Sequence, residues 1–208
     1  MSARVLALAG ALILLATAAL ANHPGARLNE VMAAREPAFE ALDHLAAPDF
    51  DLATVTGTRL QLSDFDSKVL VLSFVEGDCD ADCVKQQAAL TAVQKRVNIA
   101  PMPDMVQFVT IVAPGTALPE GAAFGPANWQ MLTAGPGTSD LAATYTALST
   151  RPDAVPMTFM VDRVGRISGI FHSSEFGQVN MLLYINGLAN DHEKRAPSLW
   201  QRLWGLFW

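Results

Sequence analysis

The sequence is poor in charge, and most of the charge that it has is negative. Lys and Arg together number 14 and Asp and Glu 20, which gives a formal net charge of −6, and charged residues make up only 16% of the chain. No stretch is rich in Lys and Arg. Proteins that bind nucleic acid carry a basic patch or stripe, so we do not expect nucleic acid as a partner.

Residues that bind metals or form disulfides are also scarce. The chain has 4 His and 2 Cys, too few Cys for a four-cysteine zinc site or a disulfide-stapled small domain. The His-Glu-x-x-His pattern of zinc hydrolases is absent from the sequence. Hydrophobic residues make up 51% of the 208 residues, enough to fill a core. We therefore expect one globular α/β domain with a single cysteine pair.

Residues 1–21 have the pattern of an export signal. Arg4 precedes an uncharged apolar run over residues 5–20, and Ala-Leu-Ala at 19–21 is a small-x-small cleavage pattern. The run is shorter than the roughly 20 residues that span a bilayer, which favours cleavage over a retained anchor. Either outcome predicts an exported, periplasmic protein. A retained anchor would attach it to the outer face of the inner membrane.

The rest of the chain divides into three regions. Residues 22–47, interrupted by Pro37, are expected to be an exposed lead-in with short helical pieces. Residues 48–190 form the folded domain, and residues 191–208 form a tail. Apolar runs and their periodicity predict a hairpin within 50–65, strands over 68–74, 105–112, 157–161 and 166–171, and helices over 83–97, 139–148 and 176–188. This order indicates a central sheet with helices on both faces.

The helix predicted over 83–97 has apolar and polar residues at helical spacing. The apolar positions include Val84, Ala88 and Leu90, and the polar positions include Gln87 and Gln94. This pattern predicts that the valines and leucine face the core and the glutamines face solvent.

Cys79 and Cys83 lie where a buried strand passes into this helix. The positive end of a helix favours thiolate over thiol. A spacing of four residues, about one helical turn, lets both sulfurs face the same way. Such a pair can exchange disulfides or bind a soft metal ion such as Cu(I). A plain structural disulfide is the alternative, although so short a loop gives little stabilisation.

A proline begins one of the predicted strands. Pro156 follows Val155 and precedes the strand over 157–161. Proline is tolerated at the first residue of a strand, or in cis at a tight turn beside an active site. Both conformations remain open from the sequence.

Four segments then carry a resemblance to a known family. They are PDFDL at 48–52 with TG at 56–57, KVLVLSF at 68–74 before the C-x-x-x-C pair, NWQMLTAG at 128–135, and FMVDRVGRI at 159–167. With them the chain resembles the Sco/SenC family of thioredoxin-fold copper-delivery proteins. The resemblance implies a thioredoxin-like α/β fold, with a central mixed sheet flanked by helices and an N-terminal hairpin extension. It also implies copper bound by both cysteines and a histidine, and a respiratory oxidase subunit as partner.

The family's copper-binding histidine has no counterpart, since Ala154 occupies its expected place. His172, at the end of a predicted strand, is one candidate for a third ligand. Met157 is another, because a thioether suits Cu(I). The alternatives are a structural histidine and a core methionine.

The tail is short and rich in tryptophan. Trp200, Trp204 and Trp208 recur every four residues, and Trp favours the boundary between membrane and water. An amphipathic helix that contacts a membrane surface or a partner is one interpretation. Packing against the domain itself is the other.

These features leave three functions open. The first is a copper chaperone for cytochrome oxidase assembly, and the second is a thiol–disulfide oxidoreductase that acts on another redox client. In the second, Cys79 attacks and Cys83 resolves the mixed disulfide. The third is a non-catalytic assembly scaffold with a vestigial cysteine pair.

Overall fold

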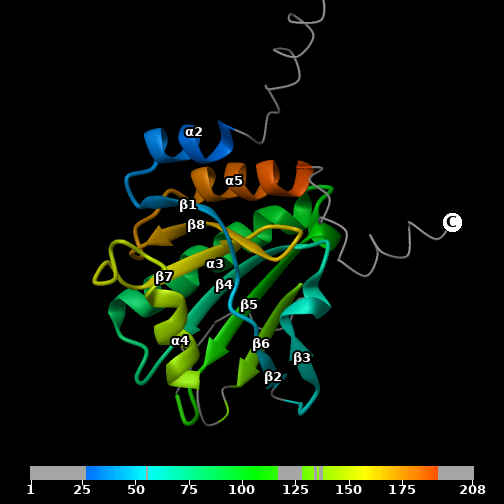
Figure 1. Cartoon of the computed structure of the whole chain (residues 1–208), viewed down its shortest axis with the longest axis vertical. Helices are drawn as coiled ribbons and strands as arrows, with labels where there is room; N and C mark the ends of the chain where they lie inside the picture. The colour runs from blue at the N-terminus through cyan, green and yellow to red at the C-terminus, as the bar shows by residue number, and fades with distance from the viewer. Residues whose placement is uncertain (1–26, 55, 117–127, 134, 136–137, 192–208) are drawn as a thin grey trace, which may run out of the picture.

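The computed structural model describes residues 27–191, apart from residue 55 and residues 117–127, 134 and 136–137 (Figure 1). The export signal predicted over 1–21 and the Trp-rich part of the tail lie outside the described residues.

One eight-stranded mixed sheet forms the centre of the domain, with strand order β1-β8-β7-β4-β5-β6-β2-β3. Strands β4, β5 and β6 run parallel to one another, and all other neighbouring pairs are antiparallel. In chain order the strands are β1 Phe39–Ala46, β2 Asp51–Thr54, β3 Arg59–Gln61, β4 Val69–Val75, β5 Val106–Val112, β6 Trp129–Thr133, β7 Met157–Val161 and β8 Arg166–His172.

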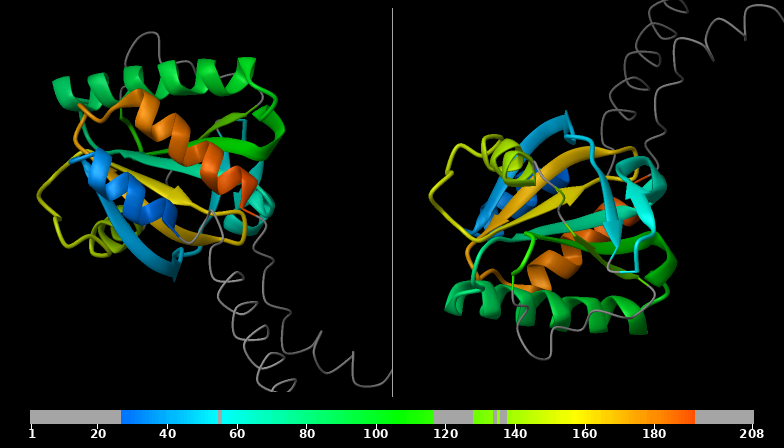
Figure 2. Two further views of the ribbon diagram at one scale, coloured as in Figure 1. Left: turned by 90° about the horizontal axis from the view of Figure 1, so that it is seen from above. Right: turned by 90° about the horizontal axis from the view of Figure 1, so that it is seen from below.

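Helices cover both faces of this sheet. The described helices are α2 Leu28–Arg35, α3 Ala81–Ile99, α4 Thr138–Thr146 and α5 Gln178–Asn190, with short 3-10 turns η2 Leu62–Phe65 and η3 Pro103–Met105. Helices α3 and α5 lie on one face and α4 on the other (Figure 2). Each face has its own buried cluster, one around Leu90, Val93 and Ile185 and the other around Tyr145 and Phe159. The predicted α/β fold with a helix-flanked mixed sheet is confirmed.

The central strands form for the reason that the sequence suggested. Every residue of β5 is buried, as is every residue of β4 except Phe74. Continuous runs of Val, Leu and Ile suit parallel strands that are covered on both faces. The cysteine-bearing turn therefore follows a strand that is buried at every position but one.

The expectation of an exposed lead-in is wrong for its described part, residues 27–47. Helix α2 and strand β1 belong to the fold, and β1 pairs with β8 through partners such as Phe39 and Phe171. Met32 is 2% exposed and Phe39 5%. Polar residues at 40, 43 and 44 interrupt the alternation of apolar and polar residues that marks a strand. The sequence therefore shows no clear sign of β1, which forms by pairing with β8.

The predicted hairpin forms and extends the opposite edge of the sheet. Strand β2 pairs with β3 and, on its other side, with β6, where Ala53 lies opposite Thr133. Gly57 turns the hairpin at a φ of 87°, a left-handed conformation that glycine adopts without strain.

The buried face of α3 matches the prediction only in part. Leu90, Val93 and Val97 face the core as expected. Val84 is 42% exposed and Ala88 is exposed, whereas Gln87 and Gln94 are 2% and 1% exposed. The glutamines are tolerated inside because each finds a hydrogen-bond partner there.

The pairing of β1 with β8 can be tested at Gly169. A methyl group added there would collide with the buried Phe39 ring and lie 3.1 Å from the carbonyl oxygen of Glu40. We expect Gly169→Ala to lower the free energy of unfolding by about 1–3 kcal/mol, since overpacking displaces a buried ring. Gly135→Ala is the control, because a methyl group there meets no atom within 4 Å. Equal stability of the two variants in denaturant titrations would show that β1 is not packed as described.

Candidate functional site: a disulfide at the start of α3

The cysteine pair spans the first turn of α3. Cys79 and Cys83 form a disulfide with their Cα atoms 5.2 Å apart, and both residues are partly exposed. Asp80 caps the helix between them, since its carboxylate accepts hydrogen bonds from the amides of Asp82, at 3.1 Å, and Cys83, at 2.9 Å. The cap fixes the backbone that carries both sulfurs.

The surroundings of the pair are acidic. Three aspartates occupy every second position of the turn that carries the cysteines, and all are exposed: Asp78, Asp80 and Asp82. Asp82 forms an exposed ion pair with Lys85 at 3.4 Å and accepts a hydrogen bond from Ser174 at 3.2 Å. The positive N-terminus of the helix favours the thiolate form of a cysteine, whereas the negative charge of these aspartates disfavours it.

Pro156 lies at the same edge of the sheet as the pair. The Val155–Pro156 peptide bond is cis, one of the two conformations that the sequence left open. Strands β4 and β7 are antiparallel with Ser73 opposite Thr158, so the start of β7 adjoins the end of β4. The turn that carries Cys79 leaves from this end of β4.

Gln86 ties the cysteine helix directly to this strand start. Its side-chain amide donates to the carbonyl oxygen of Met157, at 2.9 Å, and to the hydroxyl of Thr158, at 3.0 Å. Gln86 is fully buried and lies less than one helical turn after Cys83. The residue after the cis proline is therefore fixed relative to the cysteine helix.

A second buried glutamine continues the polar contacts beneath α3. Gln87 donates to the hydroxyl of Ser73 at 3.4 Å and accepts from Thr110 at 3.5 Å. The hydroxyls of Ser73 and Thr110 are 3.0 Å apart, and the indole of Trp129 donates to Thr110 at 3.1 Å. The network joins α3 to the strands that it covers. Our interpretation of the sequence missed it, because we placed Gln87 on the solvent face.

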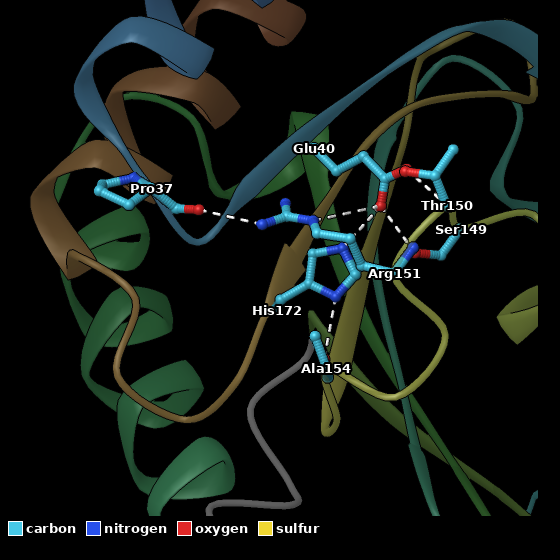
Figure 3. A network of polar contacts seen from close by, with 7 residues as sticks. All are labelled: Pro37, Glu40, Ser149, Thr150, Arg151, Ala154 and His172. Carbon is cyan, nitrogen blue, oxygen red and sulfur yellow. Dashed lines mark hydrogen bonds and ion pairs between the residues drawn. The ribbon is translucent and has the colours of Figure 1, made fainter.

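His172 belongs to a separate buried cluster around Glu40 (Figure 3). Its Nε2 is 2.8 Å from a carboxylate oxygen of Glu40, and its Nδ1 is 2.9 Å from the carbonyl oxygen of Ala154. The side chain of His172 is 3% exposed and that of Glu40 is 9% exposed.

The carboxylate of Glu40 is held in its ionised form. Burial by itself raises the pKa of Glu40, but hydrogen bonds from Ser149, Thr150 and His172 outweigh burial and lower it from 4.5 to about 2. Both ring nitrogens of His172 therefore already have partners, Nε2 in the Glu40 carboxylate and Nδ1 in the Ala154 carbonyl oxygen.

The structure gives both candidates for a third copper ligand other contacts. Each ring nitrogen of His172 lies within hydrogen-bond distance of a protein partner, which fits the structural histidine that the sequence left as the alternative. Met157 is 6% exposed and packs in the core cluster of the α4 face. Within the described ranges, no group of three or more His, Cys, Asp or Glu residues could hold a metal ion.

Fold and site together define a thioredoxin-fold protein with a C-x-x-x-C pair opposite a cis proline. The fold is similar to that of BsSco, a member of the Sco family of cytochrome c oxidase assembly proteins, at 16% identity and a TM-score of 0.56, with 73% of this chain aligned to 98% of that one. A SCO1/SenC family lipoprotein from Bacillus anthracis aligns at 17% identity and a TM-score of 0.54, over 73% and 98% of the two chains.

Thiol–disulfide proteins share the fold as well. A thiol:disulfide interchange protein from Chlorobium tepidum aligns at 17% identity and a TM-score of 0.53, over 73% of this chain and all of the other. No protein-family model and no curated protein matches the sequence. The resemblance to Sco proteins is therefore confirmed for the fold. Among the helices of the described residues, none combines the length and apolar character needed to cross a membrane.

The Glu40 cluster predicts how stability depends on pH. The folded pKa of Glu40 is about 2 and the ordinary value is 4.5, so its ionisation stabilises the fold above pH 4.5, and this contribution is lost as the pH falls toward 2. We expect the difference in free energy of unfolding between wild type and Glu40→Gln to shrink by about 3 kcal/mol from about pH 6 to about pH 2. Glu30→Gln, in an exposed ion pair, is the control. A difference that stays constant over this range would contradict the assignment.

Proposed function

We propose that this chain is an exported thiol–disulfide exchange protein of Sco/SenC type, with Cys79 and Cys83 as its reactive pair. The observation that carries the proposal is the partly exposed disulfide at the start of α3, beside a cis proline at the same sheet edge. A fold stabiliser would more usefully join distant segments, whereas an accessible pair at a helix N-terminus suits exchange chemistry.

The exchange transfers two electrons to the client. The thiolate of reduced Cys79 attacks a disulfide of the client protein, which breaks the client's sulfur–sulfur bond, forms a mixed disulfide and releases one client thiolate that takes up a proton. Cys83 then attacks the Cys79 sulfur and releases the second client thiol. The pair ends oxidised and the client reduced, and a dithiol donor returns the pair to its starting state.

A second function, binding of Cu(I) as cargo, is favoured by the Sco-type spacing of the pair. Two thiolates are the soft ligands that Cu(I) prefers, and a linear two-sulfur site needs no third ligand. A respiratory oxidase subunit is the proposed acceptor, and another redox client is the alternative. Export to the periplasm rests on the apolar segment before Asn22. Membrane contact through the tail, residues 191–208, remains part of the proposal.

The exchange function predicts a specific loss of activity. We expect the reduced full-length protein to accelerate reduction of insulin by dithiothreitol, and Cys79→Ser to abolish the acceleration because the attacking sulfur is lost. Cys83→Ser should accumulate the mixed disulfide, detected by mass spectrometry. Ala88→Ser, which adds the same hydroxyl at an exposed position of α3, should keep full activity. Wild-type turnover at the background rate would disprove the exchange function.

Copper binding predicts a two-sulfur stoichiometry. In an anaerobic competition titration we expect one Cu(I) per reduced wild-type chain, and loss of this site in Cys79→Ser/Cys83→Ser. Met157→Leu and His172→Asn should bind with unchanged affinity, since Met157 is buried in the core and both ring nitrogens of His172 already have protein partners. Weaker Cu(I) binding by both single variants would instead indicate a third ligand from this edge of the sheet. Equal binding by wild type and the double variant would rule out the copper site.

A further inference from the structure

The segment that presents the cis proline has no regular secondary structure of its own. It connects the end of α4 at Thr146 to the start of β7 at Met157, and it ends in Val155, which is 59% exposed, and Pro156. A segment without a ladder of backbone hydrogen bonds holds its position through other contacts. Turn hydrogen bonds join the segment to the end of α4 and hold it within itself. Most of its polar contacts to other parts of the fold converge on one side chain from a distant strand.

That side chain is Glu40 of β1. One carboxylate oxygen accepts from the Ser149 hydroxyl, at 2.6 Å, and from His172, at 2.8 Å. The other accepts from the backbone amide of Thr150, at 2.8 Å, and from its hydroxyl, at 2.7 Å. Arg151 lies 3.8 Å from the carboxylate and donates to the carbonyl oxygen of Pro37 at 3.1 Å (Figure 3). The beginning of the segment is therefore fixed to β1.

His172 extends this hold to the far end of the segment. Its Nδ1 bonds to the carbonyl oxygen of Ala154, the residue before Val155, while its Nε2 bonds to Glu40. The positions of both residues are set by the sheet, since Glu40 lies opposite Ile170 in β8 and His172 lies opposite Met157 in β7. The Glu40 carboxylate thus contacts the start of the segment directly and its end through the ring of His172.

We infer that Glu40 is a positioning residue of the redox site: with His172 it holds residues 149–156 so that the cis proline stays fixed beside the Cys79–Cys83 pair. This inference rests on the proposed exchange function. Glu40 touches neither sulfur by any described contact, so it acts through the segment. Its loss should impair alignment of a client polypeptide more than the reactivity of the sulfurs themselves.

The test compares Glu40→Gln with Glu30→Gln in the full-length protein. The first change replaces a buried acceptor by an amide, and the second makes the same change in an exposed ion pair on α2. Two quantities are measured at a temperature where both variants remain folded. They are amide hydrogen exchange over residues 150–156, and kcat/KM for a protein disulfide compared with the rate for a small disulfide such as oxidised glutathione.

We expect Glu40→Gln to accelerate amide exchange in this segment by about tenfold or more, because the amide keeps one acceptor oxygen and loses the two contacts made to the other. The value of kcat/KM for the protein disulfide should fall by about tenfold, while the small-disulfide rate and Glu30→Gln stay at wild-type levels. Uniform acceleration of exchange across the molecule, or equal loss with both substrates, would show that Glu40 is only a structural residue and overturn the inference.

Two further variants keep the test decisive if Glu40→Gln does not fold. Thr150→Val removes the hydroxyl contact to Glu40, and Ser149→Ala removes the Ser149 contact to Glu40 together with the one that Ser149 accepts from the Arg151 amide. Both leave the Glu40–His172 pair in place, so smaller shifts in the same direction are expected, and no shift in either would overturn the inference. If wild type reduces no protein disulfide at all, the exchange function fails. In that case amide exchange still decides whether Glu40 holds the segment.

Discussion

The antiparallel pairing of β4 with β7 is the constraint on which the site depends. With Ser73 opposite Thr158, the end of β4, which leads to Cys79, and the start of β7, which follows Pro156, meet at one edge of the sheet. Neither segment could reach the other by local chain geometry, because about 80 residues separate them. The register of two buried strands therefore brings an accessible disulfide and a cis proline together.

The strand register brings the cysteine helix and the start of β7 close together, and two buried polar clusters then fix their positions. Gln86 joins the cysteine helix to the first residues of β7, and Glu40 with His172 holds the segment that leads into β7. Unpaired polar groups in a core are costly, whereas fully paired ones specify a single arrangement. Both clusters pair their groups, so the two sides of the site are held by directional bonds as well as by apolar packing.

The sequence predicted the central strands, the position of the cysteine pair after a strand, and a proline that can be cis. Continuous apolar runs and turn-forming Gly and Pro residues are local signals that the sequence shows directly. It did not predict β1, whose strand pattern is broken by polar residues, among them Glu40, whose side chain is 9% exposed because of tertiary contacts. It also misplaced part of the buried face of α3, since Val84 and Ala88 are exposed and Gln87 and Gln94 are buried. Gln86 and Gln94 lie on the same helical stripe as Leu90 and Val97, so the period was visible, but glutamine gives no sign that it will be buried. The role of His172 depends on Glu40, 132 residues away, and no local pattern reveals such a partner.

The reduction potential of the Cys79–Cys83 pair tests the central claim most directly. It is measured by equilibrating the full chain with thiol–disulfide buffers, alkylating the free thiols and counting them by mass spectrometry. An exchange site predicts a reversible two-electron titration between about −300 and −120 mV, with the fold intact in both states. A pair that stays oxidised until well below about −300 mV, or that is reduced only as the protein unfolds, would instead be a structural disulfide and contradict the account.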